Sequence, residues 1–87
     1  MTIGTHAHVA NGVVERADGL NFGGRYHFDA TDTEPEGLEL AVWAEDTDAV
    51  QIELHVGETL EFSGQTWRLD EISSEGRGWS ATLTRVA

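Results

Sequence analysis

The chain has 87 residues, enough for one domain with a single thin core, and this size leaves little volume for a deep enclosed pocket. Sixteen acidic residues stand against five arginines and no lysine, and the resulting net charge of −11 would repel a nucleic acid. The absence of cysteine excludes disulfides, thiolate nucleophiles and cysteine-based metal sites, and it favours a reducing compartment.

The N-terminal sequence MTIGTHAHVANG lacks the basic start and the apolar segment of a secretory signal, and no run of residues reaches the length of a membrane span. We therefore expect a soluble, cytoplasmic protein with no membrane partner. Residues 3–10 alternate in polarity, with Ala7 and Val9 in one phase and His6 and His8 in the other. This alternation predicts a half-buried strand.

Two turn signals follow this first strand. Asn11-Gly12 and Asp18-Gly19 are typical of tight hairpin turns, because both central positions of such a turn need a positive φ. Two-residue loops at both sites give conflicting phases, since Val9 would share a face with Val14 but Leu20 would lie on the opposite face. One turn must therefore be longer, or a bulge must shift the phase.

Two longer strands are predicted next, over residues 20–28 and 38–44, with an acidic loop at 29–37 between them. Gly23-Gly24 indicates a bulge, a bend or the close approach of another backbone. In the second strand, Trp43 lies in the phase opposite to the aliphatic residues. The first strand should place on its core face Leu20, Phe22, Gly24, Tyr26 and Phe28.

The segment 50–69 is predicted to form three neighbouring strands with one continuous apolar face. A three-residue loop at 57–59 would join the first two strands, and a turn at Gly64-Gln65 would join the second and third. The facing pairs would be Val56 with Leu60 across the first turn and Phe62 with Trp67 across the second.

The C-terminal region continues this pattern. The third strand of the segment runs to Ile72 with a phase change that indicates a bulge, residues 73–78 form a turn, and residues 79–86 form the last strand, with Trp67 and Trp79 in the core. No segment has the 3.6-residue apolar period of a helix. The sequence therefore predicts a single all-β domain over residues 1–87, an antiparallel sandwich or barrel of about seven short strands joined by meander-like hairpins.

Four histidines fall in polar phases of these strands. His6 and His8 face the same side of their strand, as a metal half-site requires, and His27 or Asp29 could supply a third ligand. A physiological metal site built from His6, His8 and His27 is one hypothesis. Four solvent-facing histidines without a metal are the alternative, because nothing in the spacing fixes the third ligand.

A tract of eight carboxylates between residues 29 and 48, with no basic residue among them, is a candidate partner-binding surface. A solvated loop is the alternative interpretation. Trp43 could anchor a partner from an exposed position, although it could also be buried in a closed sheet. The residues that we select for partner binding are Trp43, Asp32, Glu34, Glu36, Glu45, Asp46 and Asp48.

No catalytic motif is present in the sequence: it has no nucleophile elbow, phosphate loop or dinucleotide fingerprint. The composition favours a non-enzymatic module without a cofactor, which binds another protein or a second copy of itself. One alternative is a small-molecule or metal binder that uses the histidine-bearing face. Another is an acidic mimic of nucleic acid that inhibits a DNA-binding protein.

The C-terminal half contains the sequence VGETLEFSGQTWRLDEI, followed by a Gly/Ser-rich loop and ATLTRV. This pattern resembles a family of small uncharacterised actinobacterial proteins of unknown function, and the resemblance covers about the last forty residues. It implies a cytoplasmic bacterial protein and assigns no mechanism.

Overall fold

A computed structural model describes residues 4–74 and 78–87, and these residues form eight strands and no helix. The strands are β1 (His6–Ala10), β2 (Val14–Ala17), β3 (Leu20–Phe28), β4 (Gly37–Ala44), β5 (Val50–His55), β6 (Thr59–Phe62), β7 (Gln65–Ser73) and β8 (Ser80–Arg85). The all-β prediction is confirmed, with one strand more than the seven or so expected. Ile3 and the centre of the predicted turn at 73–78 lie outside the described residues.

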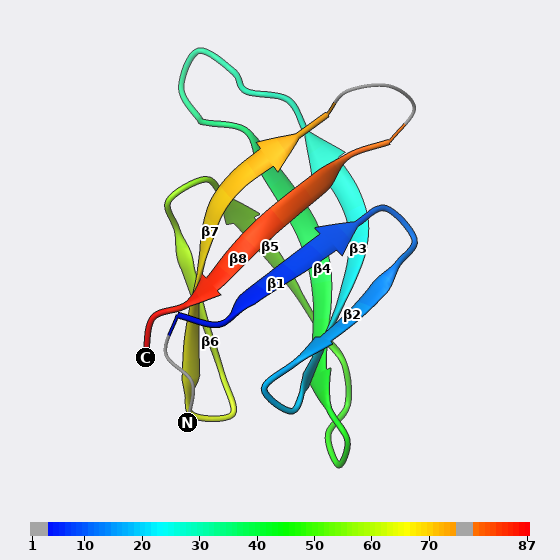
Figure 1. Cartoon of the computed structure of the whole chain (residues 1–87). Coiled ribbons are helices and arrows are strands. Elements are labelled where there is room, and N and C mark those ends of the chain that lie inside the picture. Colours follow the sequence, from blue (N-terminus) through cyan, green and yellow to red (C-terminus); the bar gives the residue numbers. More distant parts are fainter. Residues whose placement is uncertain (1–3, 75–77) are drawn as a thin grey trace.

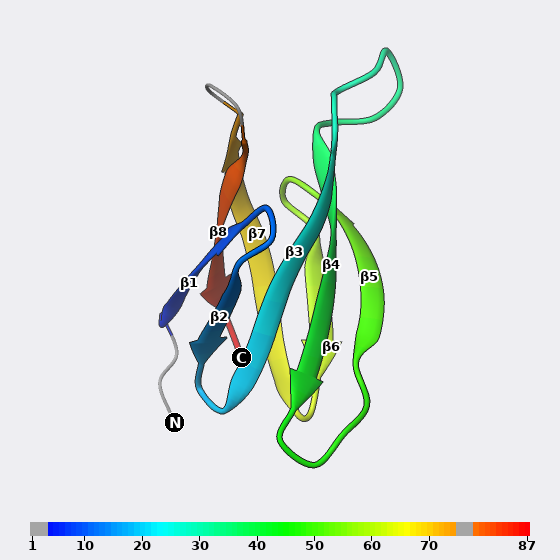
Figure 2. The same cartoon turned by 90° about the vertical axis from the view of Figure 1, so that its right-hand side faces the viewer.

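The strands form two four-stranded antiparallel sheets, with the orders β1-β8-β7-β6 and β2-β3-β4-β5. Figure 2 shows the sheets from the side as two facing layers, so the fold is a sandwich and the barrel alternative is not adopted. Their inner faces enclose the core. From Leu38 to Ala44 of β4 every second residue is buried, as the alternation predicts. The described residues contain no helix long and apolar enough to cross a membrane.

The core is built from the inward phases of both sheets. Trp67 of β7 is fully buried, and its ring meets the Phe22 ring of β3 edge-on with the centroids 5.0 Å apart. Trp79 is half-buried and packs against the same core. The other large side chains with almost no exposure are Leu20, Leu38, Leu40, Leu54, Leu69, Leu83, Val9 and Val42.

Two tight hairpins have positive φ at both turn residues. Asp18 and Gly19 (φ 50° and 79°) join β2 to β3, as the sequence predicts. Ser63 and Gly64 (φ 52° and 78°) join β6 to β7. The second turn therefore lies one residue before the predicted Gly64-Gln65 position, and this corrects the register: Leu60, and not Phe62, is opposite Trp67.

The turn at Asn11-Gly12 exists, but it does not close a hairpin. Val13 N donates to Ala10 O at 3.2 Å and Gly12 has φ 75°. The strands on its two sides belong to different sheets, since β1 pairs with β8 and β2 pairs with β3. The conflict of phases found in the sequence disappears for this reason, because residues of β1 and β2 have no common register.

The segment at Gly57 is a second crossing between the sheets, so the predicted three-stranded sheet over residues 50–69 is wrong. Gly57 N donates to Leu69 O at 2.8 Å, and Leu69 N donates to Glu58 O at 3.0 Å. These bonds to β7 draw the chain away from β5 and into the other sheet. Val56 and Leu60 are therefore not a cross-strand pair.

Strand β3 contains a bulge, one of the alternatives indicated by Gly23-Gly24, with Arg25 as its extra residue between the paired positions Gly24 and Tyr26. A Cβ at Gly24 would meet the Ala10 carbonyl and the Trp79 ring, so another backbone does approach closely here. The bulge reverses the phase of the strand. Tyr26 and Phe28 are consequently 56% and 37% exposed, and the prediction that they face the core is wrong. A second predicted bulge is confirmed between Leu69 and Glu71 of β7.

Candidate functional site

The structure separates the predicted site residues into distinct regions, and the first is the outer face of β1. His6 and His8 are both exposed, and each is paired with a residue of the neighbouring strand β8. Their cross-strand neighbours are threonines: His6 Nδ1 lies 3.0 Å from Thr84 Oγ1, and His8 Nδ1 lies 3.4 Å from Thr82 Oγ1. The two histidines share a side as predicted, and their polar contacts are hydroxyl groups.

Thr84 connects His6 to a carboxylate on β7. The Thr84 hydroxyl donates to Asp70, and Arg68 Nε donates to Asp70 Oδ1 at 2.7 Å. The hydrogen bond from Thr84 and the nearby Arg68 guanidinium hold the pKa of Asp70 below its usual value, because both favour the ionised carboxylate. The result is a polar row across three strands.

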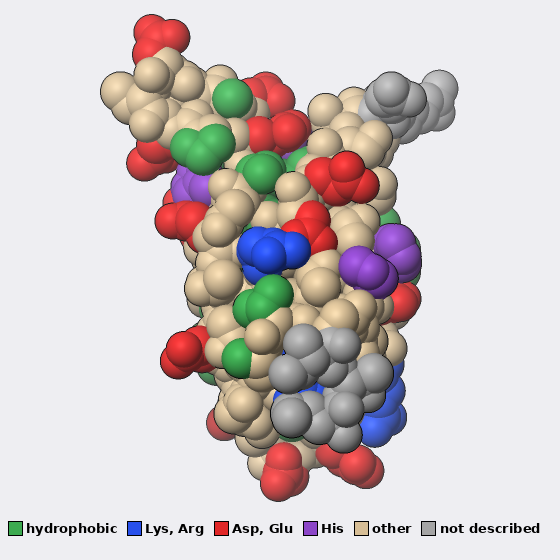
Figure 3. All heavy atoms as spheres, turned by 60° about the vertical axis from the view of Figure 1, so that its left-hand side comes forward, with side chains coloured by type: hydrophobic (Ala, Val, Ile, Leu, Met, Phe, Trp, Pro, Cys, Tyr) green, Lys and Arg blue, Asp and Glu red, His purple; other side chains and the backbone are tan. Residues whose placement is uncertain are grey.

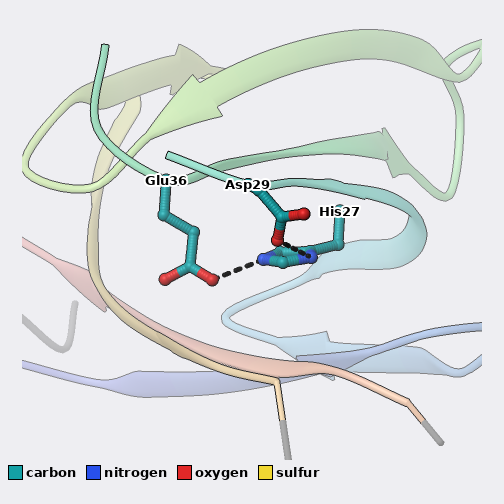
Figure 4. A group of neighbouring side chains, drawn as sticks. All are labelled: His27, Asp29 and Glu36. Carbon is teal, nitrogen blue, oxygen red and sulfur yellow. Dashed lines mark hydrogen bonds and ion pairs between the residues drawn. The ribbon is translucent and has the colours of Figure 1, made fainter. Parts of the chain in front are cut away.

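The second region lies at the C-terminal end of β3. The bulge at Arg25 has turned His27 toward the Trp79 ring. The two rings stack with their centroids 6.3 Å apart, and the His27 side chain is 13% exposed. His27 Nε2 lies 2.5 Å from Glu36 Oε2, and Nδ1 lies 3.8 Å from Asp29 Oδ1. Figure 4 shows the ring with Glu36 on one side and Asp29 on the other. One ligand atom from each of the three residues lies within 4.8 Å of the others.

His55 of β5 lies on the other side of the same loop. Its ring packs over Gly37, where a Cβ would be only 2.6 Å from Nδ1. Nδ1 donates to Pro35 O at 2.8 Å, and Nε2 is 3.1 Å from Glu53 Oε2. These two contacts raise the pKa of His55, since the protonated ring can donate from both nitrogens at once.

The loop 29–36 is thus held from two strands. Glu36 contacts His27, and the Glu36 carbonyl accepts from Val56 N at 3.0 Å. At its tip, Thr31 Oγ1 accepts from Glu34 N at 3.1 Å, while Thr31 N donates to Glu34 O at 2.8 Å. The sequence predicted an acidic loop here. It did not predict that His27 and His55 contact this loop.

The predicted acidic surface divides into two groups at opposite ends of β4. Asp32, Glu34 and Glu36 lie in the β3–β4 loop, and Glu45, Asp46 and Asp48 lie in the β4–β5 turn (Figure 1). The eight residues of β4 lie between these groups, and the strand is about 24 Å long at the usual rise of an antiparallel strand. On the face drawn in Figure 3 the carboxylates are dispersed, and histidines lie in more than one place.

Trp43 projects from the outer face of β4. Its ring lies over Gly23 of the neighbouring strand, where a Cβ would be 3.4 Å from Trp43 Cζ3. Beside it is a shallow groove of about 230 Å³, lined in part by Ala41, Val13 and Val14. The two valines are 50% and 57% exposed. Trp43 is therefore half-buried, which is intermediate between the exposed and the buried states that the sequence left open. Its ring forms one side of an apolar groove.

A family model matches residues 4–87 of the chain, and its description is a family of unknown function, DUF6406. The chain belongs to this family. No curated protein and no solved structure matches the chain significantly.

Because this family has no assigned activity, the chemistry must be inferred from the regions themselves. The groove at Trp43 can accept an apolar side chain, as hydrophobic surface hollows do. The group of His27, Asp29 and Glu36 combines one imidazole with two carboxylates, which can hold a proton or a cation. A signal for this group did exist in the sequence: a hairpin closed around 29–37 places the end of one strand beside the start of the next.

Proposed function

We propose that this protein is a non-enzymatic module that binds another protein through the outer face of the β2-β3-β4-β5 sheet. Trp43 is the anchor of this surface. The observation that supports the proposal best is the apolar groove beside the Trp43 ring, with Val13 and Val14 half exposed on its edge. Tryptophan is enriched among the residues that contribute most to protein interfaces.

The occupant that we propose is an extended segment of the partner with one apolar side chain and one lysine or arginine. The apolar side chain fills the groove, and burying it stabilises the complex by about 1.5–3 kcal/mol. The basic side chain meets the carboxylates that follow Trp43 in the chain, at Glu45, Asp46 and Asp48. The net charge of −11 adds a general attraction for a basic partner.

The separation of the two carboxylate groups favours this interpretation over a nucleic-acid mimic. A mimic needs a regular run of negative charge along one surface. Here the group near Trp43 and the group in the loop 29–36 lie at opposite ends of β4, and the carboxylate between them, Glu39, is paired with Arg25 at 3.6 Å. We further infer that the protein acts in the cytoplasm of an actinobacterium, and that a second copy of the chain is an alternative partner.

The test uses capture of partners from a lysate of the source cells by four matched baits. These are the wild type, Trp43→Ala, Glu45→Gln/Asp48→Asn and Asp32→Asn/Glu34→Gln. The last two variants remove the same charge from opposite ends of β4. Recovered partners are identified, and the affinity of each purified partner for each bait is measured at low and high salt.

We expect Trp43→Ala to weaken binding about 30-fold, which corresponds to the loss of about 2 kcal/mol at an interface anchor. The variant at Glu45 and Asp48 should bind more weakly at low salt and lose much of its salt dependence. The variant at Asp32 and Glu34 should resemble the wild type. A partner with equal affinity for the wild type and for Trp43→Ala would contradict the proposal, provided both baits are folded.

A further inference from the structure

We propose that His27, Glu36 and Asp29 form a binding site for a divalent transition-metal ion such as Zn²⁺. Within residues 4–74 and 78–87, these three side chains are a group of metal-type ligands whose ligand atoms lie within 4.8 Å of one another. They come from the end of β3, the start of the loop 29–36 and its last residue (Figure 4). This site is independent of the groove at Trp43.

The backbone fixes where the ligands start. Paired strands place His27 opposite Leu38 and Phe28 opposite Gly37, so Asp29 and Glu36 leave the hairpin at the same level. The Arg25 bulge then sets the direction of the His27 ring, and stacking on Trp79 holds the ring at 13% exposure. A ligand that is fixed before the metal arrives costs less conformational entropy on binding.

The ligand atoms are those that zinc selects. Zinc binds imidazole nitrogen at about 2.0–2.1 Å and carboxylate oxygen at about 2.0–2.2 Å. His27 Nε2 and Glu36 Oε2 already face each other at 2.5 Å. An ion between them requires this separation to widen by roughly 1 Å at a tetrahedral angle. Glu36 can move that far, because its side chain is 29% exposed and lies in the loop.

Asp29 strengthens the site from the other side of the ring. Its side chain is 95% exposed, and Oδ1 lies 3.8 Å from His27 Nδ1. Rotation of this exposed side chain brings the carboxylate either to the ion as a third ligand or onto Nδ1–H. In the second arrangement it orients the ring and leaves the Nε2 lone pair for the metal, as carboxylates beside metal-bound histidines do. Water completes the coordination in both cases.

The pair on β1 is the rival metal site. His6 and His8 have the HxH spacing, but they contact the hydroxyl groups of Thr84 and Thr82, and hydroxyl groups are poor ligands for zinc. The carboxylate near His6, Asp70, already accepts hydrogen bonds from Thr84 and Arg68. His27 has two carboxylates instead. The electrostatic argument also favours His27, because two negative charges beside the nitrogen attract a cation at short range.

The experiment titrates chelator-treated, metal-free protein with ZnCl₂, following heat by calorimetry and the melting temperature in parallel. The variants are His27→Gln, Glu36→Gln and Asp29→Asn, and the matched control is His6→Gln/His8→Gln. We expect one equivalent of Zn²⁺ per wild-type chain and a rise in melting temperature. His27→Gln and Glu36→Gln should weaken binding at least tenfold, Asp29→Asn about tenfold, and the control should bind as the wild type does.

A second measurement uses the wild type alone, so it does not depend on whether the variants fold. Nitrogen chemical shifts of the imidazole rings in the wild type report which histidine the ion contacts. We expect Zn²⁺ to shift the His27 ring and to leave the His6 and His8 rings unchanged. The proposal is overturned if Zn²⁺ does not bind the wild type, if the control loses binding while His27→Gln retains it, or if the shifts fall on His6 and His8.

Discussion

Two pairs of histidines fall in polar phases of the sequence pattern, yet their surroundings in the structure differ. His6 and His8 face threonines of β8 on an exposed sheet surface. His27 and His55 lie on the two sides of the loop 29–36, each against a carboxylate. A strand phase states only which side a residue faces. The contacts of each side chain depend on the neighbouring strand or loop. For this reason two similar sequence patterns lead to contacts with hydroxyl groups in one case and with carboxylates in the other.

The contrast also extends to packing. Gly37 leaves room for the His55 ring, and Trp79 covers the His27 ring, so the loop side is built around its histidines. The β1 pair lies on an exposed face. The residues of β1 that are buried in the core are Ala7 and Val9. Substitutions on the loop side should therefore destabilise the fold more than equivalent substitutions on β1. The following variants test this difference.

The largest effect is expected from Gly37→Ala. A Cβ there would lie 2.6 Å from His55 Nδ1 and 2.9 Å from Leu54 O, and the backbone oxygen has little freedom to move. We expect this overpacking to lower the free energy of unfolding by about 2 kcal/mol, as measured by urea denaturation. The control on the other sheet, Thr82→Ala, should change it by less than about 0.5 kcal/mol. Equal stabilities for these two variants would remove the contrast.

A smaller effect is expected from His27→Gln in metal-free protein. The change removes the stacking on Trp79 and weakens the contact with Glu36, and it should cost about 1 kcal/mol. His8→Gln removes only one long hydrogen bond to Thr82 on an exposed face and should be close to neutral. Urea denaturation in the presence of a chelator compares the two. A larger loss for His8→Gln would show that the β1 face matters more for stability.

The strands themselves could be predicted from the sequence, because burial on one face leaves a period of two. The buried residues of β1 and β4 and the bulge of β7 were found in this way. The turn at Asp18-Gly19 was found from its glycine, and the bulge of β3 was one of the alternatives that Gly23-Gly24 indicated. Glycine in a turn indicates a reversal of direction but does not say which strand will be the partner. The turns at Gly12 and Gly57 therefore looked like hairpins, although each crosses to the other sheet.

The candidate sites were predicted less completely, for the same physical reason. Trp43 was selected because its phase differs from that of the aliphatic residues around it; its outward phase is confirmed, and its role in binding stays a prediction. His27 was selected as a metal ligand with His6 and His8, but the structure places it with Asp29 and Glu36. A change of phase at Arg25 and the closure of a loop determine that group. Neither can be read from residue spacing along one strand.

The loop side should also respond to pH. The Pro35 carbonyl, followed by Glu53 and then Glu34 and Glu58, raises the pKa of His55 above 6.5. The folded state therefore binds the proton more tightly than the unfolded state. The resulting stabilisation is fully present below the unfolded pKa and is lost as the pH rises through the folded pKa.

We expect the stability difference between the wild type and His55→Gln to be larger at pH 5.5 than at pH 8.5. Denaturation at the two pH values measures it, and NMR titration of the ring gives the pKa directly. A difference that grows with pH would have the wrong sign. Glu53→Gln is the informative control, since it keeps the His55 ring and removes one cause of its raised pKa, so the pH dependence should become smaller but persist.

The smallest effect on stability is expected in the polar row formed by His6, Thr84, Asp70 and Arg68. The hydrogen bond from Thr84 is the main cause that lowers the pKa of Asp70 below 3.8, so Thr84→Val should raise this pKa while Thr84→Ser should keep it low. A lowered carboxyl pKa stabilises the fold above the unfolded pKa, and this stabilisation is lost as the pH falls through the folded pKa. The two variants should therefore differ at pH 7 and converge in acid, by less than about 1 kcal/mol at this partly exposed site. Carboxyl NMR titration measures the pKa. If valine and serine give the same value, the hydroxyl group does not connect His6 to Asp70, and the β1 face is simply a solvated surface.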